Sequence, residues 1–148
     1  MRTIHRKVVG AFIFSDDNKI LLGKSGVFEG LWCVPGGGIN KDESHRDGLN
    51  RETLEETGID ISTALVEKID GDNSGVSKKT LRDTNERVIA EMDFYDYVVR
   101  IDRIANSVKL ILEDDFYDAK WFAASELKSL DLAPGTKKRL IQLGYLVV

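Results

Sequence analysis

Hydrophobic and polar residues change their periodicity several times along the chain, and each change marks a predicted element. Two β-rich stretches, 8–15 and 19–24, are joined by the turn-forming residues 16–18, which predicts an N-terminal β-hairpin. The short run 32–34 predicts a third extended piece that ends at Pro35. The three glycines that follow predict a sharp break, because glycine adopts backbone angles that are closed to other residues.

A helix is predicted over 44–57, where proline is absent and β-branched residues are few. Its first residues have the S-x-x-D form of a capping box that starts at Ser44, and Gly58 supplies a left-handed C-terminal stop. Apart from Leu49 and Leu54 this helix has almost no apolar residues. An ordinary hydrophobic stripe therefore does not explain its position in the fold.

The second half of the chain predicts a mixed set of strands and helices. Strands are expected at 64–69, 78–82, 87–101 and 118–122, and residues 59–61 are also strand-like. Two short helices follow, one capped by Ser125 and the other running from about Pro134 to a stop at Gly144. Strands mixed with three helices predict an α/β sandwich on a mixed sheet. Residues 1–148 are expected to form a single domain, because no linker-like or low-complexity tract interrupts them.

Composition excludes several classes of protein. With 148 residues, 42% hydrophobic and 31% charged, the chain is neither fibrous nor membrane-spanning in character. The apolar run 8–14 is too short for a signal peptide, and the single cysteine, Cys33, gains nothing from an oxidising compartment, so a cytoplasmic location is expected. The net charge of −4 opposes binding to nucleic acid, and no membrane partner is expected. A small phosphorylated ligand would need a divalent cation to approach this acidic chain.

The predicted helix 44–57 carries the most distinctive chemistry. At about 100° per residue, Glu52, Glu55 and Glu56 fall within a roughly 100° arc of its surface. Glu52 and Glu56 repel each other when both are charged, and a bound Mg²⁺ or Mn²⁺ reverses that sign. Arg51 lies four residues before Glu55 and can hold its carboxylate by a charge-assisted hydrogen bond. Taken alone, however, such a cluster is more often a solvated acidic helix face.

The flanking sequence decides between these interpretations. From Gly37, through Glu43, to the run Arg51-Glu52-Thr53-Leu54-Glu55-Glu56-Thr57-Gly58-Ile59, the segment resembles the signature of the Nudix hydrolases in register. Thr53 stands where an aliphatic residue is usual, and Gly48 stands where alanine is usual. The resemblance implies a Nudix α/β/α sandwich that hydrolyses a nucleoside diphosphate linked to another moiety, with Mg²⁺ or Mn²⁺ as cofactor.

The same resemblance implies roles for individual residues. The metal would be held by the Gly37 carbonyl and by Glu52, Glu55 and Glu56, and it would lower the pKa of a bound water. The general base is expected to be Glu52, with Glu55 in reserve. Glu43 and Arg51 would fix the loop and the ligand carboxylates.

Further residues are candidates for contacts with the substrate. Gly36, Gly37 and Gly38 would let the backbone approach the phosphates. Lys24 could reach a phosphate, Phe28 could stack on a base, and Glu113, in the acidic run 113–115, could supply another ligand or base. The alternatives are a solvated side chain for Lys24, a core or loop anchor for Phe28, and a solvated acidic loop for Glu113.

Scattered residues outside the signature narrow the class of substrate. Gly26, Phe28, Trp32 and the segment 116–121 resemble the bacterial Nudix nucleoside triphosphatases that act on pyrimidine deoxynucleotides. The prediction is hydrolysis of a nucleoside triphosphate to monophosphate and pyrophosphate, by a monomer or homodimer whose partner is a small nucleotide. Two alternatives stay open: a nucleotide-sugar or dinucleotide pyrophosphatase, and a non-catalytic module that only binds a nucleotide. The crowded glutamates weigh against the second.

Overall fold

The computed structural model describes residues 1–26, 28–113 and 115–147, so Asp114 of the acidic run lies outside the described residues. Its elements in chain order are β1 (Arg2–Phe14), β2 (Ile20–Ser25), β3 (Trp32–Cys33), β4 (Gly36–Gly38), α1 (His45–Thr57), β5 (Leu65–Lys68), β6 (Ser74–Thr80), β7 (Arg87–Arg100), the 3₁₀ turn η1 (Ala105–Ser107), β8 (Phe116–Phe122), the 3₁₀ turn η2 (Ala124–Ser129) and α2 (Pro134–Gln142).

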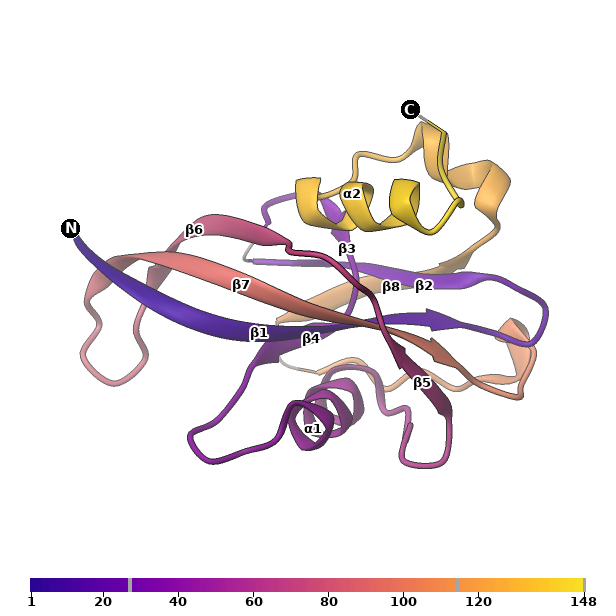
Figure 1. Ribbon diagram of the computed structural model, residues 1–148, viewed down its shortest axis with the longest axis horizontal. Helices are drawn as coiled ribbons and strands as arrows, with labels where there is room; N and C mark the ends of the chain where they lie inside the picture. Colours follow the sequence, from indigo (N-terminus) through magenta and orange to yellow (C-terminus); the bar gives the residue numbers. More distant parts are fainter. Residues whose placement is uncertain (27, 114, 148) are drawn as a thin grey trace.

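The strands form one mixed sheet around a long parallel pair. Strands β1 and β7 pair in parallel from Arg2↔Val88 to Phe14↔Arg100. Strands β2 and β4 pair antiparallel with β1, β5 and β6 pair antiparallel with β7, and β8 pairs antiparallel with β2. Helix α1 covers one face of this sheet and α2 covers the other (Figure 1). The predicted α/β sandwich on a mixed sheet is therefore confirmed.

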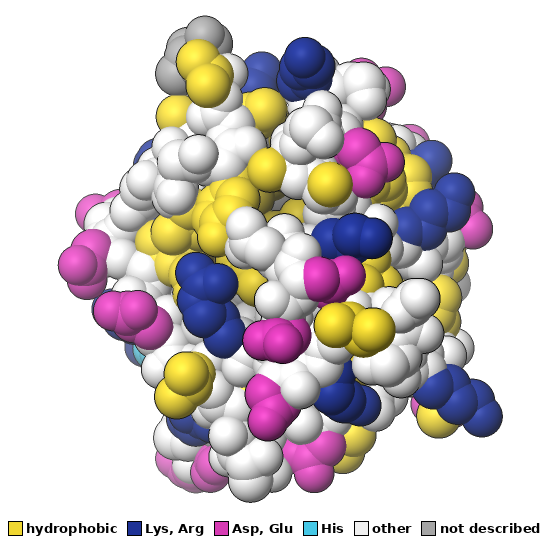
Figure 2. All heavy atoms as spheres, turned by 90° about the vertical axis from the view of Figure 1, so that its right-hand side faces the viewer, with side chains coloured by type: hydrophobic (Ala, Val, Ile, Leu, Met, Phe, Trp, Pro, Cys, Tyr) yellow, Lys and Arg dark blue, Asp and Glu magenta, His cyan; other side chains and the backbone are white. Residues whose placement is uncertain are grey.

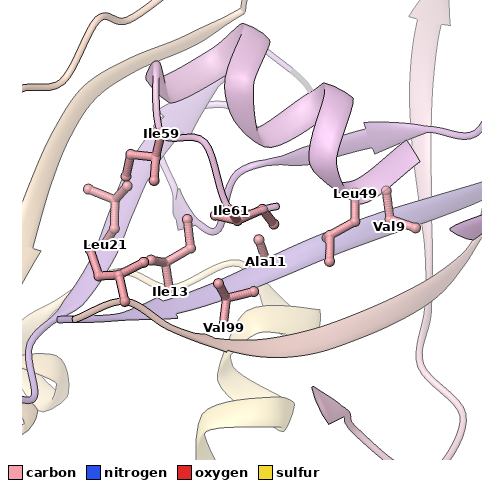
Figure 3. Packing of buried hydrophobic residues seen from close by; sticks show 9 residues of the cluster. Val9, Ala11, Ile13, Leu21, Leu49, Ile59, Ile61 and Val99 are labelled. Atoms are coloured by element: carbon pink, nitrogen blue, oxygen red, sulfur yellow. The ribbon is translucent and has the colours of Figure 1, made fainter. Parts of the chain in front are cut away.

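Alternation along β1 divides the hydrophobic core between the two faces. Val9, Ala11 and Ile13 face α1 and pack with Leu49, which is fully buried (Figure 3). Phe12 and the other alternate positions face α2 and form a second cluster. Helix α1 is thus anchored mainly by one leucine and by the residues after it, which leaves its remaining surface available for polar chemistry.

Most predicted elements are confirmed, with shifted ends. Strand β1 begins at Arg2, because the half-exposed residues 2–7 are paired along their whole length with β7. Strand β6 occupies Ser74–Thr80, where 78–82 was expected. The turn η2 follows Ala123, and not Ser125, since the Glu126 carboxylate accepts a hydrogen bond of 2.8 Å from the Ala123 N–H.

Two predictions about local structure are wrong. Residues 59–61 form no strand, and Ile59 and Ile61 instead lie in the connection after α1 with their side chains buried in the core. The glycines 36–38 form no sharp break, because they pair with β1 as the strand β4. None of the three has a positive φ, so glycine is required there for a reason other than its backbone freedom.

The surface carries both signs of charge. At the end of the molecule turned toward the viewer in Figure 2, basic and acidic side chains are interspersed around a hydrophobic area. Within 1–26, 28–113 and 115–147, no helix is both long enough and apolar enough to cross a membrane.

Candidate active site

Helix α1 is fixed at both ends by the caps expected from the sequence. The Ser44 hydroxyl accepts a hydrogen bond of 3.0 Å from the Asp47 N–H. Gly58 adopts a φ of 77°, and its N–H donates to the Leu54 carbonyl. Between these caps the buried Leu49 faces the core, so that Glu52 and Glu56 turn toward β4 while Leu54 is exposed to solvent.

The glycines of β4 allow this close approach. A Cβ on Gly36 would collide with the Val9 carbonyl, and one on Gly37 would collide with the Glu52 carboxylate. The Gly36 N–H donates a hydrogen bond of 2.7 Å to Oε1 of Glu56. Glycine is therefore required here because the backbone touches two acidic side chains and a neighbouring strand.

Arg51 is the centre of the polar network beside β4. Its Nε and Nη2 donate to the two oxygens of Glu43 at 2.8 and 2.9 Å, and its Nη1 donates to Oε1 of Glu52 at 2.8 Å. The Nη2 also donates to the Gly38 carbonyl at 3.0 Å. The predicted contact with Glu55 exists but is longer, at 3.4 Å, and the Glu55 side chain is 51% exposed. Arg51 thus holds Glu43, Glu52 and β4 more firmly than Glu55.

These contacts change the proton affinities of the network. The hydrogen bonds from Arg51, and then the one from the Asn40 N–H, lower the pKa of Glu43 to about 2. The same pairing, with Glu43 first, raises the pKa of Arg51. The loop before α1 is consequently tied to the helix by an ion pair that stays charged over the whole ordinary pH range.

The predicted metal ligands are only partly brought together. Glu52 and Glu56 lie against β4, whereas Glu55 lies mostly in solvent. Across the part of the chain that the structure describes, no three Asp, Glu, His or Cys groups converge closely enough to form a preassembled metal cluster. The donors beside Gly37 are nevertheless carboxylate and carbonyl oxygens, the types that Mg²⁺ and Mn²⁺ prefer. The residues therefore fit a hard divalent cation in chemical type.

A cavity of about 860 Å³ extends from these glutamates across β4 and β1 to β7, β6 and the start of α2. Its wall near α1 carries Arg6 and Lys79, and burial, followed by repulsion from Arg6 and Arg82, lowers the pKa of Lys79. Its other end is lined by apolar and amide groups, among them Phe94 and Asn73. The cavity thus combines charged groups beside the glutamates with apolar and polar groups elsewhere, as a nucleotide requires.

Of the three remaining substrate candidates, only Phe28 lines the cavity, where its ring lies 6.3 Å from that of Phe94. The Lys24 ammonium group lies over the Trp32 ring at 4.9 Å, outside the cavity lining, because the side chain extends along the adjacent strand. Glu113 is exposed and touches the site only through its N–H, 3.4 Å from the Glu56 carbonyl. The structure thus places Lys24 and Glu113 outside the cavity lining, and their roles in substrate binding stay predictions. Near Glu113, it is Asp115 that lines the cavity, and its carboxylate accepts a hydrogen bond from the Gly26 N–H.

Several cavity residues were not predicted from the sequence. Arg6 and Lys79 belong to half-exposed strand segments, and their common face follows from the pairing of β1, β7 and β6. Asp96 and Arg139 form a buried ion pair of 2.9 Å between β7 and α2. A lone aspartate within the apolar run 94–99 is the one signal in the sequence that pointed to this pair.

Comparisons with known proteins agree with this geometry. A model of the NUDIX domain matches residues 4–143. The nucleoside triphosphatase NudI of Klebsiella pneumoniae is 31% identical over 122 residues, which are 82% of this chain and 82% of that protein. The E. coli dihydroneopterin triphosphate pyrophosphohydrolase has a similar structure, with a TM-score of 0.69 over 94% of this chain and 96% of that one, at 14% identity. The MutT protein of Methanosarcina mazei gives a TM-score of 0.61 over 97% and 94% of the chains, at 21% identity.

Proposed function

The chain belongs to the NUDIX family and is a Nudix hydrolase, and from this premise we propose that its substrates are nucleoside triphosphates. The reaction would split a phosphoanhydride bond and release a nucleoside monophosphate and pyrophosphate. The observation that carries the proposal is the cavity, because its lining combines Glu52 and Glu56, the cations of Arg6 and Lys79 near them, and apolar side chains such as Phe94. The name of the NudI relatives supports the same substrate class.

The charged end of the cavity suits a triphosphate group. When bound, Mg²⁺ or Mn²⁺ neutralises phosphate charge and makes a coordinated water more acidic. We assign Glu52, Glu55, Glu56 and the Gly37 carbonyl as the groups that would hold the cation. Arg6 and Lys79 would bind the phosphates that leave as pyrophosphate, and the crowding of positive charge around Lys79 is relieved when an anion binds there.

Two of these carboxylates, Glu52 and Glu55, would have different roles in the hydrolysis. A water attacks phosphorus, its proton passes to a glutamate, and the bond from phosphorus to the bridging oxygen breaks. Of the two candidate bases, the contacts favour Glu55, because Arg51 holds Glu52 in a 2.8 Å ion pair and leaves Glu55 with only a 3.4 Å contact. A carboxylate held that firmly by an arginine is a weaker base. Glu52 would then serve mainly as a cation ligand.

The preference for pyrimidine deoxynucleotides and the cytoplasmic location remain part of the proposal. The substrate preference is supported by residues outside the signature, and the location by the buried, unpaired Cys33. The partner would be a small nucleotide, bound by a monomer or homodimer, with no role for nucleic acid or membrane.

The test is a pyrophosphate-release screen over all ribo- and deoxynucleoside triphosphates, with Mg²⁺, with Mn²⁺ and with EDTA. A nucleotide sugar and a dinucleotide polyphosphate are assayed beside them by release of monophosphate. We expect equal amounts of monophosphate and pyrophosphate from triphosphates, and no turnover in EDTA. Turnover of the sugar or dinucleotide alone would favour the second enzyme class. Binding of triphosphates without any hydrolysis would favour a non-catalytic module.

A further inference from the structure

The floor of the cavity, at the end away from the glutamates, contains a buried polar group that the proposed reaction does not use. Asp96 is 3% exposed, and its Oδ2 accepts hydrogen bonds from Nε of Arg139 at 2.9 Å and from Nδ2 of Asn73 at 3.1 Å. Arg139 is satisfied by further bonds to the carbonyls of Asp70 and Gly71. The pair is therefore held rigidly between β7, the loop before β6, and α2.

The second oxygen of Asp96 is left without a donor. Oδ1 lies directly over Gly10, where a Cβ would be only 2.5 Å away, and Asp96 lines the cavity. No hydrogen bond to this oxygen comes from residues 1–26, 28–113 or 115–147. Because Asp96 lines the cavity, this oxygen can accept a hydrogen bond from a donor group of a bound ligand.

Asn73 adds a second acceptor beside it. Its amide nitrogen donates to Asp96 Oδ2 and to the Gly135 carbonyl at 3.2 Å, and both neighbours are acceptors, which fixes the orientation of the amide. Both amide hydrogens are thereby used, and Oδ1 of Asn73 is left to accept. This side chain is 7% exposed and also lines the cavity. The floor thus presents two acceptor oxygens.

The register of the sheet places Asp96 two strands away from the β4 backbone that contacts the glutamates. Gly36 pairs with Gly10, and Gly10 pairs with Asp96, so the three lie side by side on β4, β1 and β7. Neighbouring strands are about 4.8 Å apart, which puts Asp96 roughly 10 Å from the Gly36 backbone that binds Glu56. The Asp96 carboxylate and the Val34 side chain lie over Gly10, and Gly10, Gly36 and Asp96 all line the cavity. The floor and the glutamates therefore border one cavity, and a nucleotide that reaches both would have its phosphates toward α1 and its base over the floor.

We propose that Asp96 and Asn73 read the base of the bound nucleotide and select bases that carry an exocyclic amino group. This inference rests on the proposed function. The amino group of cytosine, adenine or guanine donates to acceptor oxygens, whereas the O4 atom of uracil or thymine in the same position would face them with its own lone pairs. Phe94 and Phe28, on the cavity wall, supply an apolar surface for the ring of the base.

The first test changes the substrate and leaves the protein intact. We compare dCTP with the triphosphate of 2-pyrimidinone deoxyriboside, in which hydrogen replaces the amino group, and with dUTP, at one Mg²⁺ concentration. A buried acceptor that loses its donor typically costs tenfold or more in kcat/KM, so we expect at least a tenfold loss for both analogues. Values within threefold of dCTP would overturn the inference and leave the proposed function standing. Failure to hydrolyse any triphosphate would overturn both.

The second test separates base reading from a purely structural role. Asn73→Ala removes one acceptor, together with the hydrogen bonds that Asn73 donates to Asp96 and Gly135, and keeps the Asp96–Arg139 pair. Asn106→Ala, at an exposed position outside the cavity, is the matched control. We expect Asn73→Ala to reduce the ratio of kcat/KM for dCTP over the 2-pyrimidinone analogue at least threefold, and Asn106→Ala to leave it unchanged. If Asn73→Ala lowers the melting temperature and leaves the ratio unchanged, the residue is structural and the inference is wrong.

Discussion

Arg51, on α1, donates two hydrogen bonds, of 2.8 and 2.9 Å, to the carboxylate of Glu43, which lies in the segment that links β4 to α1. A third nitrogen of the same guanidinium group holds Glu52 at 2.8 Å. The planar fork of arginine makes this possible, because its donors point in fixed directions toward two carboxylates at once. The segment that links β4 to α1 is thereby fixed to the helix that carries the proposed cation ligands.

Arg51→Lys is expected to loosen the cation site without changing substrate choice. Lysine keeps the charge but loses the fork, so the Glu52 carboxylate is held less firmly. We predict a 10–100-fold weaker apparent Mg²⁺ affinity, the usual range for groups that orient metal ligands. Titration of Mg²⁺ against rate for several nucleotides measures this directly. A normal Mg²⁺ dependence with an altered ranking of nucleotides would mean that Arg51 contacts the substrate.

The Glu43–Arg51 pair also predicts how stability depends on pH. Because the pKa of Glu43 falls from its ordinary value of 4.5 to about 2 in the folded protein, its stabilising effect is present above pH 4.5 and is lost as the pH falls toward 2. The melting temperature of Glu43→Gln should therefore be lower than that of the parent at pH 7. This difference in melting temperature should shrink as the pH falls from 5 to 3. Glu67→Gln, on the exposed edge strand β5, is the matched control. A difference that stays constant with pH would show that the ion pair does not contribute.

Thr53 offers a test of packing in the helix. Its side chain is fully buried against the core, and its hydroxyl finds no hydrogen-bond partner among the residues that the structure describes. Valine has nearly the same shape and helix propensity, so Thr53→Val removes the unsatisfied group at little cost. We expect the free energy of unfolding to rise by about 1 kcal/mol. Chemical denaturation measures it, with Thr63→Val at an exposed position as the control. A loss of stability would mean that the hydroxyl has a partner, such as an ordered water.

Local signals in the sequence were enough to predict the helix and its polar face. Ser44 and Gly58 mark the ends of α1 by short-range hydrogen bonds, and the arc of glutamates follows from helical geometry alone. What the sequence could not provide was contact across strands. Arg6, Lys79 and Asp96 share one cavity only because β1, β7 and β6 pair in a particular register. The error at 36–38 has the same origin, since the crowding by Val9 and Glu52 is a long-range contact.

Glu55→Gln and Glu52→Gln together test which glutamate is the general base. If Glu55 accepts the proton, Glu55→Gln at saturating Mg²⁺ should lower kcat by about 10²–10⁴-fold and flatten the acidic limb of the pH–rate profile. Glu52→Gln should mainly raise the Mg²⁺ concentration needed for half-maximal rate, and excess Mg²⁺ should recover much of its kcat, because Arg51 already neutralises that carboxylate. Rates measured across a pH series and a Mg²⁺ series separate the two effects, with Glu67→Gln as a control expected to match the parent. The opposite pattern, in which Glu52→Gln loses the acidic limb and Glu55→Gln is rescued by Mg²⁺, would assign the base to Glu52 and leave Glu55 as a ligand.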